Sequence, residues 1–267
     1  MAVACSHTSE TVPAPPSHST ASFVLEQSAA QPGSHVNLGI KFVTESGWHI
    51  YWLNPGDSGE PPRIQWRLPA GITAGTIAWP TPMRLTTTAG TDYGYEGTTV
   101  LLSSLQIPPT AQPGATLEVS GNLRWLVCHD ICVPQRAQLS TPLRIAGASS
   151  VDESASSLLQ SAAERMPKPL PARFRPLVTS SADSFRLTLA TGEPVTKAEF
   201  FPAEAEQVDD QAPQVLRTNP GVLHLTLKQA ENLGQAPRRL KGVIVLNGRD
   251  AYALDAPIRS MVRQKRR

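Results

Sequence analysis

The sequence predicts an all-β protein with two β-sandwich domains that are joined by a short helix and a proline-rich linker. Alternating apolar and polar residues, the pattern of a half-buried strand, recur along most of the chain. Proline, with 25 residues, outnumbers glycine, with 18, which excludes a bundle of long helices because proline interrupts helix interiors. The 267 residues suffice for one large or two small hydrophobic cores.

The charge of the chain argues against nucleic acid as a partner. Five of the 24 basic residues lie at the C-terminal end, at Arg259, Arg263, Lys265, Arg266 and Arg267. The other 19 stand against 22 acidic residues, so the body carries a charge of about −3 rather than the formal +2. Because a nucleic-acid binder spreads its basic residues over a folded face, we expect no such partner. We interpret 259–267 as a basic tail, with contact to anionic lipid as the alternative.

The first 20 residues are rich in Ser, Thr and Pro and are expected to form a flexible tail. No stretch approaches the roughly 18 apolar residues that span a bilayer, and the N-terminus lacks the pattern of a complete secretory signal. The run A-V-A-C at 2–5 resembles the end of a lipoprotein cleavage site. Cys5 is therefore a candidate lipidation site, with an ordinary tail cysteine as the alternative.

The first sandwich is predicted over 21–148, with turn signals at 54–57, 68–71 and 112–114. All five tryptophans precede residue 150, and we expect most of them in its core. The alternation predicts strands at Phe23–Glu26, His35–Val43, Trp48–Trp52, Ile64–Leu68, Thr99–Leu102, Leu117–Val127 and Gln138–Ile145.

A helix and a linker are predicted over 149–175. Ser150 and Glu153 have the spacing of a capping box, in which each side chain binds the other's backbone amide. Apolar residues at helical spacing then predict a helix from about 153 to 166, and the run M-P-K-P-L-P at 166–171 ends it.

The second, smaller sandwich is predicted over 176–258. Apolar residues alternate around Leu187 and around Leu225, and Asn247-Gly248 is a hairpin signal between two strands. This segment lacks tryptophan and cysteine, so we expect it to act as a spacer or docking module.

The chemistry of the chain concentrates at Cys128 and Cys132, which are separated by His129-Asp130-Ile131. A tight turn over these three residues would bring the cysteines together. The spacing leaves three interpretations open. The pair is a structural disulfide worth about 2 kcal/mol, or a metal site completed by His129, with Asp130 as a further candidate ligand. The third interpretation is a redox dithiol, in which His129 or the local backbone lowers the pKa of the attacking thiol.

Several runs in order resemble the N-terminal periplasmic domain of DsbD/ScsB-type thiol:disulfide interchange proteins. The resemblance covers about 20 to 258 and is strongest in the cysteine motif W-L-V-C-H-D-I-C-V-P. The other matching runs are W-H-I-Y-W-L-N-P-G-D-S-G at 48–59, P-P-R-I at 61–64, I-A-W-P at 77–80 and Y-G-Y-E-G at 93–97.

The resemblance implies immunoglobulin-like sandwiches in the periplasm, at the inner membrane, and a thiol:disulfide interchange enzyme that needs no cofactor or metal. It implies that Cys128 and Cys132 cycle between dithiol and disulfide. Electrons would come from a transmembrane donor domain, which these 267 residues do not include, and pass to periplasmic thioredoxin-like or disulfide-isomerase-like proteins. We expect Cys128 to attack and Cys132 to resolve. The alternative is a non-enzymatic immunoglobulin-like binding module with a structural disulfide.

Four further residues are candidates near the cysteines. Tyr93, Tyr95 and Glu96, with glycines on both sides, predict a mobile cap over the pair, and the Glu96 carboxylate would handle protons. A β-turn with packed tyrosines is the alternative. Trp125 is expected to pack near the site rather than to act in it.

Overall fold

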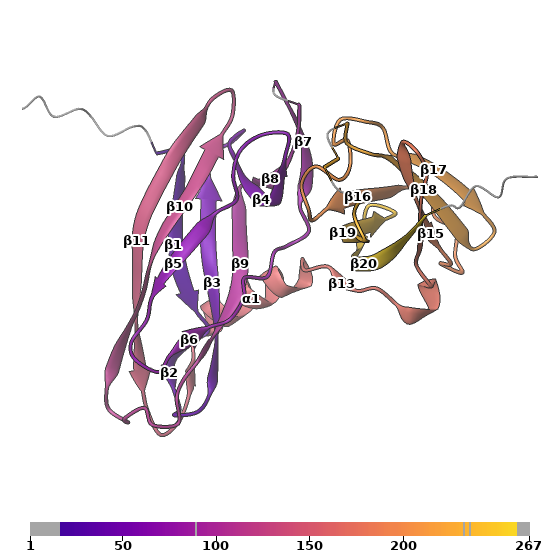
Figure 1. The fold of residues 1–267 in the computed structure, drawn as a ribbon. Coiled ribbons are helices and arrows are strands. Elements are labelled where there is room, and N and C mark those ends of the chain that lie inside the picture. The colour runs from indigo at the N-terminus through magenta and orange to yellow at the C-terminus, as the bar shows by residue number, and fades with distance from the viewer. Residues whose placement is uncertain (1–16, 89, 232, 235, 261–267) are drawn as a thin grey trace, which may run out of the picture.

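The computed structural model describes residues 17–88, 90–231, 233–234 and 236–260, so Cys5 and most of the predicted basic tail lie outside the described residues. Figure 1 shows two sheet-rich bodies, with helix α1 where the chain passes from the first to the second. The predicted all-β class with two sandwich-like bodies and one short helix is confirmed. In the part of the chain that the structure describes, no helix has the length and hydropathy to cross a membrane.

Two sheets form the first body. The smaller has the order β1-β3-β9-β6, and the larger has the order β12-β2-β11-β10-β4-β8-β7, with β5 also paired to β10. Their inner faces enclose apolar side chains such as Phe42 and Leu123. The strands are β1 Ser19–Leu25, β2 Gln27–Ala30, β3 His35–Thr44, β4 His49–Gly56, β5 Arg63–Arg67, β6 Thr73–Ala74, β7 Met83–Thr87, β8 Gly90–Glu96, β9 Thr98–Gln106, β10 Thr116–Cys128, β11 Cys132–Ile145 and β12 Ser150–Val151.

One predicted turn belongs to a strand in the structure. The run at 54–57 was expected to turn, but β4 continues to Gly56, and its pairing with β8 shifts between Tyr51 and Gly56. This bulge leads β4 into the loop that carries Ser58, whose hydroxyl lies 3.3 Å from that of Tyr51.

Helix α1, Glu153–Glu164, is shorter than predicted and has a different cap. Asp152 rather than Ser150 caps it, because Ser150 lies in β12 and pairs with β2 while the Asp152 carboxylate accepts from the Ala155 amide. Leu159 and Ala162 of the helix pack against Val100, on the sheet that contains β9.

The second body contains the order β16-β19-β20-β14-β15-β18-β17. Strand β20 pairs first with β19 and then, at its end, with β14, and so links two layers around one apolar core. The predicted hairpin is present, with Asn247 and Gly248 both at positive φ. The elements are β13 Lys168–Pro169, η1 Ala172–Phe174, β14 Leu177–Ser180, β15 Ser184–Leu189, β16 Ala198–Pro202, β17 Val215–Asn219, β18 Val222–Lys228, β19 Arg239–Leu246 and β20 Asp250–Ser260.

The two bodies share a core and a polar seam. Phe201 of the second body packs edge-on against Trp52 and Tyr93 of the first. The buried Asn54 amide donates to the Pro202 carbonyl over 2.8 Å. The second domain therefore contacts β4, which pairs with Cys128, and β8, which pairs with β4.

Candidate redox site

The cysteines close the hairpin that β10 and β11 form. Their backbone register places Cys128 directly opposite Cys132, with 4.2 Å between the Cα atoms, and the two sulfurs are bonded as a disulfide. The alternating strands on either side bring the pair together, and the three residues between them form the exposed tip of the hairpin.

The two cysteines differ in access. Cys128 is 1% exposed because β4 pairs with it from the other side, where His49 stands opposite in register. Cys132 begins β11 and is exposed, and the other neighbour of this strand, β2, pairs only with its far end at Arg144 and Ile145. Of the two cysteines, Cys132 is therefore the one that faces solvent. Beside it, Ile131 is 66% exposed, which places a large apolar side chain at the rim of the site.

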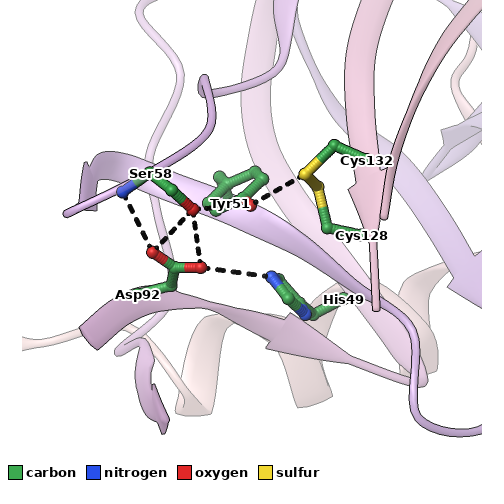
Figure 2. The surroundings of a disulfide bond; sticks show 6 residues. All are labelled: His49, Tyr51, Ser58, Asp92, Cys128 and Cys132. Atoms are coloured by element: carbon green, nitrogen blue, oxygen red, sulfur yellow. Dashed lines mark hydrogen bonds and ion pairs between the residues drawn. A yellow bond between two sulfur atoms is a disulfide. The ribbon is translucent and has the colours of Figure 1, made fainter. Parts of the chain in front are cut away.

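A chain of polar side chains leads from the exposed cysteine into the protein (Figure 2). The Tyr51 hydroxyl lies 3.5 Å from the Cys132 sulfur and 3.3 Å from the Ser58 hydroxyl. Ser58 donates to the buried Asp92 carboxylate from both its hydroxyl, at 2.9 Å, and its backbone amide, at 3.1 Å. The sulfur is thus connected to a buried carboxylate through two hydroxyl groups.

Protonation states in this cluster follow from burial. Burial raises the pKa of Tyr51 above its usual value, so the phenol keeps its proton and can donate it in a hydrogen bond. Burial lowers the pKa of His49, although Asp92 and Glu96 act in the opposite direction, so its ring is neutral near pH 7. The His49 Nε2 atom is 3.8 Å from Asp92 and has no hydrogen-bond partner among the described residues.

The expected tyrosine cap is not in a loop. Tyr93 and Tyr95 lie in β8, fully buried between β4 and β7, and face the apolar core. Their hydroxyls donate to Asp210 at 2.9 Å and to the Pro80 carbonyl at 2.8 Å. The prediction of a mobile cap is therefore wrong for these two side chains, because β8 is a paired inner strand. Glu96 is exposed at the end of β8, opposite His49 in register.

His129 and Trp125 occupy different surroundings. His129 is exposed in the hairpin tip, with Nδ1 2.9 Å from the Asp130 carboxylate and its ring tilted against Trp48 at 5.9 Å. Trp125 is buried in the core and donates from Nε1 to the Ser19 hydroxyl. The expectation that Trp125 packs near the site stays a prediction, because the contacts that its ring makes are with Ser19 and with Phe42 in the core. Over the described ranges, no three His, Cys, Asp or Glu side chains gather as a metal site.

The sequence did not single out Tyr51, Ser58 and Asp92 as site residues. Tyr51 and Ser58 lie inside the matching run at 48–59, and Asp92 directly precedes the run at 93–97. Their place in or beside these runs was the one available sequence signal, because none of the three residues forms part of a recognisable catalytic motif.

Comparisons with known proteins found a family and a similar fold for this chain. The family model described as thiol:disulfide interchange protein DsbD, N-terminal, matches residues 20–144. No curated protein matches the chain. The N-terminal periplasmic domain of ScsB from Proteus mirabilis has the same fold, with a TM-score of 0.67 and 15% identity over 90% of this chain and 91% of that one.

Other solved structures are much less similar. The major pilin GBS80 fragment of Streptococcus agalactiae matches 90% of this chain and 92% of its own, with a TM-score of 0.26 and 8% identity. Spo0M of Bacillus subtilis matches 90% of this chain and 84% of its own, with a TM-score of 0.24 and 8% identity. Both scores are too low to bear on function. Residues 20–144 therefore match the DsbD N-terminal family, as the sequence resemblance predicted, and the chain has the fold of the ScsB domain.

Proposed function

We propose that the protein relays reducing equivalents by thiol–disulfide exchange through Cys128 and Cys132. The observation that carries this proposal is the asymmetry of the disulfide, in which Cys132 is exposed at a hairpin tip and Cys128 is buried behind it. A disulfide that only strengthens the fold needs no exposed member and no polar chain leading to it. The family of residues 20–144 supports the same chemistry.

In the proposed reaction, the Cys132 thiolate of the reduced protein attacks a disulfide of the partner. A mixed disulfide forms, and the other partner sulfur leaves as a thiolate that takes up a proton. The Cys128 thiolate then attacks the Cys132 sulfur, and the second partner sulfur is released. Two electrons and two protons have then passed to the partner, and the Cys128–Cys132 disulfide is restored. This order reverses the one expected from the sequence, because Cys128 is the buried member.

Tyr51 assists this exchange by hydrogen bonding. Because Ser58 donates its hydroxyl proton to Asp92, the Ser58 oxygen accepts from Tyr51 when Cys132 is in the disulfide. When Cys132 becomes a thiolate, the Tyr51 proton can turn to the sulfur, 3.5 Å away. A hydrogen bond to the charged form favours that form, so the tyrosine stabilises the attacking species.

The proposal also includes the cellular location of the protein, its partners and the role of the second domain. The fold likeness to a periplasmic ScsB domain supports a place in the periplasm, and we propose that this place is at the inner membrane. There the protein would accept electrons from a transmembrane donor domain and pass them to thioredoxin-like or disulfide-isomerase-like proteins. The second domain would act as a brace, since its contacts reach β4 and β8 through Asn54 and Tyr93.

A redox titration tests the proposal. Known exchange proteins have reduction potentials of about −120 to −270 mV, and we expect the Cys128–Cys132 pair to fall in this range. A potential below about −300 mV would instead indicate a structural disulfide in a binding module.

Single-cysteine variants provide the second measurement. C128S leaves the exposed Cys132, and we expect oxidised glutathione to form a mixed disulfide with it rapidly, as seen by mass spectrometry. C132S leaves the buried Cys128 and should react much more slowly. Equal rates for the two variants would contradict the proposed order.

A further inference from the structure

Three arginines form a row across the outer face of the larger sheet of the first domain. In the strand register, Arg124 of β10 stands directly opposite Arg63 of β5 on one side and Arg136 of β11 on the other. All three side chains are exposed. Because neighbouring strands lie about 4.8 Å apart, the three positive charges occupy a span of about 10 Å.

Repulsion among the three guanidinium groups is unfavourable unless a negatively charged group binds to them. Like charges directly opposite each other in a sheet are destabilising. Within the described part of the chain, none of the three arginines forms an ion pair, whereas Arg84 and Arg239 each contact a carboxylate. The next row of the same face holds only amides, with Asn122 between Gln65 and Gln138.

The arginine row lines two adjoining hollows. The larger, of about 1030 Å³, has Trp66, Ile64 and Ile77 among its apolar lining residues, and the smaller, of about 240 Å³, extends toward Pro134. Of the residues that line these hollows, Glu60 alone is acidic, and it contacts none of the arginines as an ion pair in the described structure. Ile64 and Trp66 alternate with Arg63 along β5 and pack against the core, so the outer face itself offers mainly guanidinium and amide donors for carboxylates.

The row lies close to the exposed cysteine. Along β11 the residues at 132, 134, 136, 138 and 140 are all exposed, so Cys132 and Arg136 share one face of one strand. Four residues of strand span about 13 Å. A standard protein interface covers about 800 Å² on each partner, a disc of about 16 Å radius. A protein seated on the disulfide from this face would therefore also cover the arginine row.

We propose that Arg63, Arg124 and Arg136 bind an acidic segment on the surface of the protein with which Cys132 exchanges its disulfide. This inference rests on the proposed exchange function and names the partner's chemistry. Carboxylates placed about 13 Å from the partner's disulfide would remove the repulsion within the row and accept bidentate hydrogen bonds from the guanidinium groups. Opposite charge at this site would also accelerate encounter, with a strong dependence on salt.

The test compares two synthetic peptides that each carry one cysteine capped with thionitrobenzoate. A spacer of about 13 Å connects the cysteine to a run of glutamates in one peptide and a run of glutamines in the other. The reduced protein releases the coloured thiol on attack. At low salt we expect the glutamate peptide to react about tenfold faster, and this preference to vanish near 1 M salt, where the Debye length is about 3 Å.

Two triple variants separate the site from net charge. R63Q/R124Q/R136Q should react equally with both peptides. R186Q/R217Q/R249Q removes the same charge from the second domain and should keep the preference. E60Q should enlarge the preference, because it removes the acidic residue that lines the smaller hollow.

The outcomes are distinct for the two proposals. If wild-type protein reduces neither peptide, the exchange function itself fails. If it reduces both at one rate, exchange stands and the arginine inference is overturned. The row could instead prove to bind phosphatidylglycerol vesicles, in a manner that depends on the arginines and without a preference for the glutamate peptide. That result would assign the row to a membrane surface and would also overturn the arginine inference. Removing like charges should not unfold the sheet, and circular dichroism of each variant verifies this.

Discussion

The Tyr93 hydroxyl donates a hydrogen bond to the Asp210 carboxylate over 2.9 Å, and this bond joins the two domains. Tyr93 follows Asp92 directly in β8, so the strand that carries the buried carboxylate of the redox site is also anchored to the second domain. Arg84 reinforces the junction by donating to the Asp210 carbonyl at 2.6 Å and to Glu199 at 2.9 Å. The geometry around the disulfide therefore depends partly on the neighbouring domain.

Asp210 should make the stability of the protein depend on pH. Burial raises its pKa to about 6, from 3.8. Its protonated form is favoured in the folded state, so this stabilisation is complete below pH 4 and is lost as the pH rises through 6. The wild-type protein should therefore lose on the order of 2–3 kcal/mol of its free energy of unfolding between pH 4 and 6, measured by urea unfolding at each pH. We expect D210N not to show this loss.

Asp209 provides a neighbouring control with the opposite sign. The hydrogen bond from Lys228 lowers its pKa, so its contribution is present above pH 4 and is lost as the pH falls. D209N should therefore leave the slope between pH 4 and 6 unchanged. A D210N protein that retains the wild-type slope would show that another group titrates there.

Tyr51→Phe should slow the chemistry of Cys132 without unfolding the protein. The substitution removes the hydroxyl that lies 3.5 Å from the sulfur. A hydrogen bond to a charged group contributes about 1.5–3 kcal/mol, so we expect iodoacetamide to alkylate reduced Cys132 about tenfold more slowly at pH 7. Y252F, which removes a phenol hydroxyl from the second domain, is the control. Equal alkylation rates in Y51F and wild type would remove Tyr51 from the mechanism.

Gly59→Ala should displace Tyr51 from the sulfur. A Cβ at Gly59 would lie 2.0–2.4 Å from atoms of the Tyr51 ring, and the backbone there has a φ of +78°. We expect a loss of about 2–4 kcal/mol in the free energy of unfolding, together with slower alkylation of Cys132. Gly97→Ala is the matched control, because Gly97 has a φ of +66° and open space around the added carbon. A loss no larger than that of G97A would mean that backbone strain alone acts at Gly59.

Reduction of the disulfide should weaken the fold only slightly. Opening a loop as short as 128–132 costs about 2 kcal/mol in chain-entropy terms. Denaturant unfolding with and without a phosphine reductant should show this difference, with both forms cooperatively folded. The C128S/C132S double variant should be insensitive to the reductant. An unfolded reduced protein would be incompatible with a relay, which must pass through the dithiol state in every cycle.

Much of the fold was predictable because strand signals are local. Alternation of apolar residues identified the strands around Leu38, Leu123 and Leu225, and all three are present. The Asn247-Gly248 turn was predictable because its two residues tolerate positive φ. The helix cap was not predictable, because the partner of Ser150 is the distant strand β2.

The site was predictable only in part. Tyr93 and Tyr95 are two residues apart, which is itself a strand pattern, but the surrounding glycines favoured a loop. Only their pairing with β4 and β7 buries them. The same pairing brings Asp92 beside Ser58, from which it is separated by 34 positions in the chain.

The sequence by itself determined which two cysteines can meet, since three intervening residues and two alternating strands suffice to form the hairpin. Only the tertiary structure decided what each sulfur can do. Strand β4 covers Cys128 and leaves Cys132 open, and it places Tyr51 beside the open sulfur. Burial and hydrogen bonding of this kind depend on which distant strands become neighbours, and this information is absent from any short run of residues.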